Sequence, residues 1–171
     1  MVTIGFDIAQ SLGWAVLRDG ALIGYGALKV SPTKTHTENV RRIRALLESY
    51  EPIDRVGFEN VEFARFVKAH ASYVRVRTLL ELALEGSAPE AARSGVGVKT
   101  LKEWATGNGN ASKPDMVRAA NAAHGLRLLH LEHPKVVAGE ATKAQAKREQ
   151  DMADAIHVAF FVEQVARSAH L

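Results

Sequence analysis

Three short apolar runs interrupted by glycine and polar residues occupy the first thirty positions. They cover residues 3–7, 13–17 and 22–28, and the last two are separated by Arg-Asp-Gly-Ala. An Asp-Gly pair between apolar runs indicates a hairpin, so we expect an antiparallel meander of three strands. Glycines within these runs predict bulges or the close approach of another backbone, at Gly5, Gly13, Gly24 and Gly26.

The apolar period becomes helical after residue 36. Apolar side chains recur at helical spacing over residues 37–50, Pro52 follows, and residues 55–59 read as a fourth strand. The alternation continues with a long helix, a fifth strand, a short helix and a helix capped by Ser112 and Gly125. These elements are expected at residues 63–85, 94–98, 99–106 and 112–124.

The pattern is less regular towards the end of the chain. Residues 126–137 read as a sixth short strand with flanking loops, residues 138–150 as a polar, mobile linker, and residues 150–169 as a final helix. This order predicts an α/β fold with a mixed five-stranded sheet, three antiparallel strands followed by parallel ones, and helices on both faces. We expect a single domain over residues 1–171.

Composition narrows the possible classes of protein. The chain is 47% hydrophobic and 24% charged, contains no cysteine and carries a formal charge of +3. Thiolate metal sites, a cysteine nucleophile and a disulfide scaffold are therefore excluded. We expect no signal peptide, because the first strand begins at once, no membrane span, and a cytoplasmic location.

Four acidic residues stand where this fold can bring them together. Asp7 lies in an apolar strand, where a carboxylate is costly without a partner. Glu59 ends the fourth strand, which a helical crossover can place beside the first. Asp151 and Asp154 share one face at the start of the last helix.

Converging carboxylates repel one another unless cations neutralise them. Oxygen ligands without cysteine favour Mg²⁺ or Mn²⁺, and two such ions about 4 Å apart suit in-line displacement at phosphorus. Each acid also has a simpler interpretation. Asp7 would bond a backbone amide, Glu59 would be a solvated strand end, and Asp151 with Asp154 would be an acidic first helical turn.

The motifs around these acids resemble those of RuvC-type Holliday-junction resolvases of the ribonuclease H-like superfamily, including phage or prophage members. The matching segments read Gly-Phe-Asp-Ile-Ala at 5–9, Phe-Glu-Asn-Val at 58–61, Val-Lys at 98–99, Gly-Asn-Gly-Asn-Ala-Ser-Lys at 107–113 and Asp-Met-Ala-Asp-Ala at 151–155. They span nearly the whole chain.

The resemblance implies roles for these residues. Asp7, Glu59, Asp151 and Asp154 would be catalytic acids that bind two Mg²⁺ ions, with Mn²⁺ as a substitute. Lys113 would lie near the scissile phosphate. The further expected DNA contacts are Phe63, as an inserted aromatic, with Arg65, Lys68, Arg75, Arg77, Lys99 and Asn110.

The expected activity is a crossover junction endodeoxyribonuclease that resolves four-way DNA junctions by paired nicks, acting as a homodimer in DNA recombination and repair. Alternatives are a nuclease for RNA–DNA hybrids or flaps, or a non-catalytic nucleic-acid-binding module. The stretch after Asp7 also resembles the phosphate loop of actin-like ATPases, but 171 residues leave no room for their second lobe, so no nucleotide cofactor is expected. His157, three residues after Asp154, is either packed in the helix or near the metals.

Overall fold

The computed structural model describes residues 1–9, 11–30, 34–60 and 67–169, with the side chains of residues 67–70 outside the description. Its centre is a five-stranded sheet in the order β3-β2-β1-β4-β5. The strands are β1 (Val2–Asp7), β2 (Ser11–Arg18), β3 (Ala21–Lys29), β4 (Arg55–Asn60) and β5 (Ala92–Gly97).

Strand pairing confirms the predicted mixed sheet. β1 pairs antiparallel with β2 and parallel with β4, and β4 pairs parallel with β5. The meander is also present, because β2 and β3 are antiparallel with an irregularity between Val16 and Leu17. As a result β1, which is buried along its whole length, lies in the middle of the sheet.

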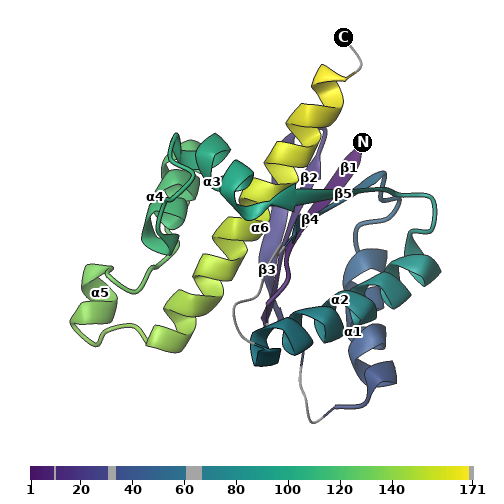
Figure 1. Cartoon of the computed structure of the whole chain (residues 1–171), viewed down its shortest axis with the longest axis horizontal. Coiled ribbons are helices and arrows are strands. Elements are labelled where there is room, and N and C mark those ends of the chain that lie inside the picture. Colours follow the sequence, from purple (N-terminus) through teal and green to yellow (C-terminus); the bar gives the residue numbers. More distant parts are fainter. Residues whose placement is uncertain (10, 31–33, 61–66, 170–171) are drawn as a thin grey trace.

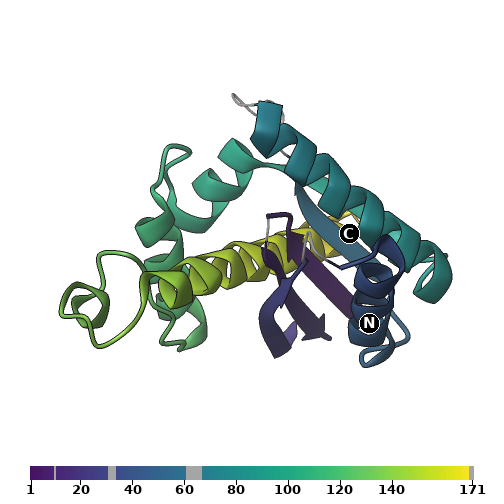
Figure 2. The ribbon, with the colours of Figure 1, turned by 90° about the horizontal axis from the view of Figure 1, so that it is seen from below.

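Helices cover both faces of this sheet (Figure 1). They are α1 (His36–Glu48), α2 (Val67–Ser87), α3 (Val98–Thr106), α4 (Lys113–His124), α5 (Pro134–Val137) and α6 (Lys143–Ser168). Figure 2 shows the sheet between α6 and the pair formed by α1 and α2. Among the described residues, no helix combines the length and apolar character needed to cross a membrane.

The prediction for residues 126–150 is wrong. The structure describes turns and the short helix α5 where a sixth strand was expected, and α6 begins at Lys143 within the expected linker. Thr142 caps this helix by accepting a hydrogen bond from the backbone N–H of Gln145 at 3.0 Å. Ala146 is fully buried in a small core with Leu129 and Val136, so tertiary packing stabilises a helical start whose sequence is mostly polar.

Helix α6 lies unusually close to the sheet at three glycines. A Cβ atom added to Gly5 would stand 2.4 Å from the backbone nitrogen of Ala159, and one on Gly13 would stand 2.2 Å from the carbonyl oxygen of Asp151. At Gly57 the neighbours are the side chains of Val158 and Val162. The prediction of close backbone approach is therefore confirmed at Gly5 and Gly13.

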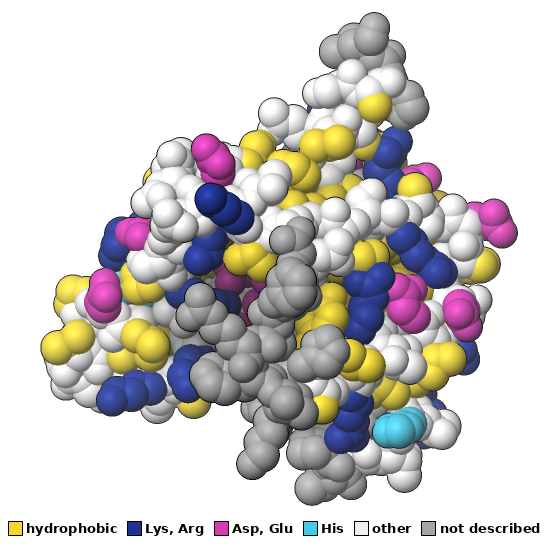
Figure 3. All heavy atoms as spheres, in the orientation of Figure 1, with side chains coloured by type: hydrophobic (Ala, Val, Ile, Leu, Met, Phe, Trp, Pro, Cys, Tyr) yellow, Lys and Arg dark blue, Asp and Glu magenta, His cyan; other side chains and the backbone are white. Residues whose placement is uncertain are grey.

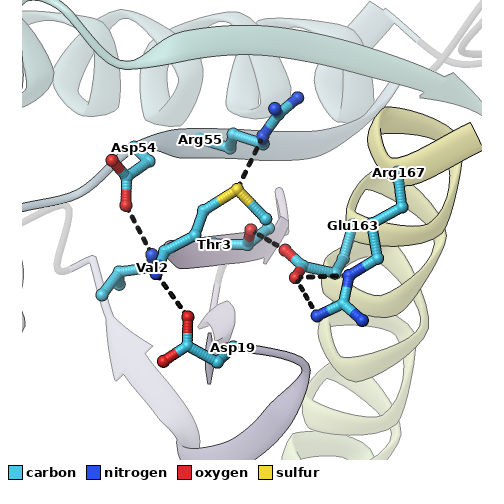
Figure 4. A network of polar contacts seen from close by, with 8 residues as sticks. Val2, Thr3, Asp19, Asp54, Arg55, Glu163 and Arg167 are labelled. Carbon is cyan, nitrogen blue, oxygen red and sulfur yellow. Dashed lines mark hydrogen bonds and ion pairs between the residues drawn. The ribbon is translucent and has the colours of Figure 1, made fainter. Parts of the chain in front are cut away.

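A polar network fixes the far end of α6 to the start of β1 (Figure 4). The Thr3 hydroxyl donates to the buried carboxylate of Glu163, which also accepts from the Arg167 guanidinium at 2.9 Å. On the same strand, the backbone N–H of Val2 donates to Asp54 at 2.6 Å. A buried carboxylate needs such partners, so this network holds α6 in one register along β1.

We predict that Gly5→Ala destabilises the protein strongly, because the new methyl group meets backbone atoms of α6 that cannot rotate away. The expected loss in the free energy of unfolding is about 2–3 kcal/mol or more, measured by urea denaturation. Gly95→Ala is the matched control, since the new methyl would meet the Asn60 side chain at the exposed edge strand β5. An equal effect of the two substitutions would contradict the close approach of α6.

Candidate active site

The four acidic residues lie around one end of β1. Asp7 is the last residue of β1 and is buried, with 4% of its surface exposed. Glu59 lies one residue beyond Phe58, which pairs with Phe6, so the two acids occupy adjacent positions on neighbouring parallel strands. Asp151 and Asp154 come from α6, where Gly13 allows the helix backbone at Asp151 to approach the sheet.

The ammonium group of Lys113 lies among these carboxylates. Its Nζ atom donates to Oδ2 of Asp154 at 2.7 Å, and it lies 3.9 Å from Oδ2 of Asp7 and 3.9 Å from Oδ1 of Asp151. The Lys113 side chain remains half exposed, whereas Asp7 and Asp154 are buried. The lysine thus neutralises part of the negative charge from the solvent side of the cluster.

A well-defined helix start places Lys113. Ser112 is the N-cap of α4, and its hydroxyl and the Asp115 carboxylate bond each other's backbone N–H groups in a capping box. Lys113 is the first residue of the helix, followed by Pro114, and Gly125 closes it in a left-handed conformation. These are the caps expected from the sequence, and they position the lysine at the end of α4 that faces α6.

Burial and mutual repulsion raise the pKa values of the acids. For Asp7, burial raises the pKa well above its usual range, and the carboxylates of Asp154 and Glu59 add to the effect, while Lys113 opposes it. Burial likewise raises the pKa of Glu59, followed by repulsion from Asp154. Burial and then Asp154 raise the pKa of Asp151 to about 6, against the attraction of Lys113.

The pKa of Lys113 is raised, whereas that of an isolated buried lysine would be lowered. Burial alone would lower this pKa, but the negative charges of Asp154 and Asp7 outweigh burial and raise it. Lys113 is therefore a firmly protonated counter-charge for the cluster. The carboxylates hold the lysine, and the lysine allows them to remain together.

The donor set suits a hard divalent cation. Oδ2 of Asp7 is buried without a hydrogen-bond partner in the described part of the chain, and all four candidate ligands are carboxylates. Within that same part, however, no group of three or more acids and histidines stands ready to hold an ion. Because Lys113 Nζ occupies the space between the carboxylates, cation binding requires this ammonium group to move aside.

The expected DNA contacts fall in different environments. Arg77 is engaged within the fold, with its guanidinium 3.2 Å above the Phe58 ring and its Nε donating to Glu81 at 2.7 Å. Arg75 is partly buried on the same helix, and its Nε has no partner among the described residues. Lys99 and Asn110 are exposed, and the Lys99 stem packs beside Gly109.

Three of the expected contacts cannot be placed. Phe63 and Arg65, including the expected inserted aromatic, lie outside the described residues, as does the side chain of Lys68. Figure 3 shows acidic side chains next to basic ones near the middle of the face it presents.

Sequence reasoning missed two further lysines whose charge reaches the cluster. Lys102, on α3, lowers the pKa of Glu59, and Lys147, on α6, lowers that of Asp151. Lys147 stands four residues before Asp151, a spacing that indicates proximity on a helix. That signal was lost because residues 138–150 were interpreted as a linker.

Comparison with known proteins identifies the fold. Neither a protein-family model nor a curated protein sequence matches the chain. Among solved structures, Thermus thermophilus RuvC in complex with a Holliday junction substrate aligns with a TM-score of 0.71 and 22% identity, covering 99% of this chain and 96% of RuvC. A second Thermus thermophilus RuvC structure gives a TM-score of 0.69 and 23% identity, covering 99% and 97%.

A more distant similarity supports the same conclusion. The yeast mitochondrial Holliday junction resolvase Ydc2 aligns with a TM-score of 0.57 and 12% identity, covering 92% of this chain and 75% of Ydc2. The similarity thus extends over nearly the whole chain. The chain has a ribonuclease H-like fold, the fold of the RuvC and Ydc2 Holliday junction resolvases.

Proposed function

We propose that this protein is a Mg²⁺-dependent endonuclease that cuts branched DNA, with four-way junctions as its principal substrate. The observation that carries the proposal is the convergence of four carboxylates and Lys113 at the end of β1. Binding of nucleic acid alone does not need such a set, because unneutralised carboxylates repel phosphate. The resolvase-like fold supports the choice of substrate.

The chain's own residues would divide the work as follows. Asp7 and Glu59 would hold divalent cations from the rigid sheet, and Asp151 and Asp154 would complete the site from α6. Two Mg²⁺ ions, or Mn²⁺ in their place, would supply positive charge and an activated water for in-line displacement at phosphorus. Lys113, released from the carboxylates, would donate hydrogen bonds to the phosphate as negative charge develops on it.

The proposed DNA surface is built from exposed positive and polar groups. Lys99 and Asn110 lie near the start of α4, and Lys143 and Lys147 lie one turn apart on the exposed face of α6, leading to Asp151. Phosphate contacts of this kind supply affinity without reading sequence. Two symmetric cuts on a four-way junction suit a C₂ homodimer, which is part of this proposal.

Replacing Asp7 with asparagine tests the mechanism. We expect Asp7→Asn to reduce junction cleavage in Mg²⁺ by at least about a hundredfold while junction binding is retained, because a metal ligand is lost and the DNA surface is not. Gel analysis of a labelled four-way junction measures both. Glu90→Gln, at an exposed acid, is the control and should cleave at the wild-type rate. Near wild-type cleavage by Asp7→Asn would contradict the mechanism.

The choice of substrate is tested with the wild-type protein. Four-way junctions, flaps and RNA–DNA hybrids of matched length are incubated with the protein in Mg²⁺. We expect paired, symmetric nicks on the junction and slow cleavage of the other two. Faster cleavage of hybrids or flaps would favour the alternative nuclease activities, and binding without cleavage would favour a non-catalytic module.

The raised acid pKa values predict how stability depends on pH. Folding raises the pKa of Asp151 from 3.8 to about 6, so the folded state binds a proton on this carboxylate more tightly than the unfolded state does. Protonated Asp151 therefore stabilises the fold at low pH, and this stabilisation is lost as the pH rises from about 4 to about 6. Asp7 and Glu59 contribute in the same direction. In EDTA, thermal unfolding should shift to lower temperature between pH 4 and pH 7.

Two variants test whether Asp151 causes this decline in melting temperature. Asp151→Asn should flatten the decline in melting temperature, whereas Glu85→Gln, on the exposed side of α2, should leave it unchanged. Mn²⁺ should raise the melting temperature of the wild type more at pH 7 than at pH 5, because protons compete with the cation. A decline that persists fully in Asp151→Asn would argue against this carboxylate as a source.

Salt dependence tests the proposed path of the DNA along α6. In an Asp7→Asn background, which should bind without cutting, Lys143→Ser and Lys147→Ser should each reduce the slope of log Kd against log salt concentration by about 0.9. Arg41→Ser, at an exposed position on α1 across the sheet, is the matched control. Fluorescence anisotropy with a labelled junction gives the slopes, and unchanged slopes in both lysine variants would place the DNA elsewhere.

A further inference from the structure

His157 forms a buried polar contact between α6 and α4. Only 2% of its surface is exposed, and its Nε2 atom lies 2.9 Å from the backbone carbonyl oxygen of Met116. A carbonyl oxygen only accepts hydrogen bonds, so Nε2 must carry the proton and donate it. This nitrogen is therefore occupied by the α4 backbone and does not face the carboxylates.

The contact stands one helical turn from the contact between Lys113 and Asp154. His157 follows Asp154 by three residues on α6, and Met116 follows Lys113 by three residues on α4, so both contacts join residues 41 positions apart. Residues three apart on a helix share a face. The two contacts therefore form successive polar links across the same helix pair, and the His157 link attaches to the backbone that carries Lys113.

Apolar contacts also join these two helices. Val117 of α4 shares an apolar cluster with Ile156 of α6, and the His124 ring of α4 stacks on the Phe160 ring of α6 with 4.1 Å between the ring centroids. Apolar contacts are not directional, whereas a hydrogen bond fixes one donor against one acceptor. In the described part of the chain, the other polar links between α4 and α6 come from the Lys113 side chain itself.

The ring of His157 is itself held in place. The Trp104 ring of α3 meets it edge-on, with 6.2 Å between the ring centroids, and Trp104 in turn packs against Phe161 at 5.7 Å. The Trp104 indole also donates to Gln164 at 3.1 Å. Because neighbours on α3 and α6 fix the imidazole, it can transmit a defined position to α4.

We propose that His157 is a positioning residue, which sets the position of Lys113 relative to Asp7, Asp151 and Asp154 by holding the carbonyl of Met116. The catalytic part of this inference rests on the proposed function, since it concerns the lysine that would meet the scissile phosphate. The structural part, that the two residues are coupled, does not depend on that function.

The kinetic test compares substitutions that keep or remove the hydrogen bond. His157→Leu fills similar space without a donor and should lower kcat for junction cleavage about tenfold, with KM unchanged within twofold, because small misplacements of a catalytic group are costly. His157→Gln places an amide N–H near the position of Nε2 and should recover most of the rate. Lys113→Ala combined with His157→Leu should be no slower than Lys113→Ala alone.

A control separates positioning from simple destabilisation. Val117→Ala removes buried packing from the same helix pair but leaves the Met116 carbonyl bonded, so it should lower the melting temperature without lowering kcat at a temperature well below unfolding. The proposal is wrong if the loss of kcat in Val117→Ala and in His157→Leu is proportional to the decrease in melting temperature of each variant, and if His157→Gln does not recover kcat. His157 would then have only a structural role.

A second measurement remains informative if the wild type does not cut junctions, a result that would overturn the proposed function. In EDTA, the melting temperature is measured for the wild type, Lys113→Met, His157→Leu and the double variant. Coupled links predict that His157→Leu lowers the melting temperature less in the Lys113→Met background than in the wild type. Additive shifts would show that His157 does not act on Lys113, and would overturn the inference independently of activity.

Discussion

The close approach of α6 to the sheet determines how the four acids come together. Gly5 and Gly13 leave no side chain between the strands and the helix backbone, and Gly57 makes room for Val158 and Val162. This contact places the segment of α6 that begins at Asp151 against the end of β1. Asp151 and Asp154 thereby reach Asp7 although more than half of the chain separates them.

Bringing these carboxylates together in a buried site has an electrostatic cost. Burial and repulsion raise the pKa values of Asp7, Glu59 and Asp151, so the folded protein must neutralise its own site. Lys113 does so by approaching three of the acids at once. In the mechanism that we propose, divalent ions would replace the Lys113 ammonium group among the carboxylates, and the lysine would then be available to a phosphate.

The sequence predicts the core of the fold well because its signals there are local. Glycine-interrupted apolar runs and an Asp-Gly turn identify the meander, and Ser112 and Gly125 mark the ends of α4. The neighbourhood of Asp7 and Glu59 follows from the parallel crossover between β1 and β4. The start of α6 could not be predicted in the same way, because burial of Ala146 against Leu129 and Val136 depends on a distant segment.

Contacts within the site were also harder to predict from the sequence, because they depend on segments that are distant along the chain. The resemblance assigned Lys113 to a phosphate, whereas in the structure its ammonium group lies among carboxylates, an arrangement that depends on how α4 meets α6. The bond from His157 to Met116 carries no sequence signature, since the acceptor is a backbone carbonyl. Residue type and spacing indicate which groups can act, but helix packing decides which of them meet.

Anomalous diffraction from crystals soaked in Mn²⁺ would locate a bound cation among the four acids without reference to activity. We expect Mn²⁺ peaks among Asp7, Glu59, Asp151 and Asp154, with the Lys113 ammonium group displaced from Asp154. Crystals without a peak at this position, in which Lys113 still bonds Asp154 at saturating Mn²⁺, would contradict this expectation.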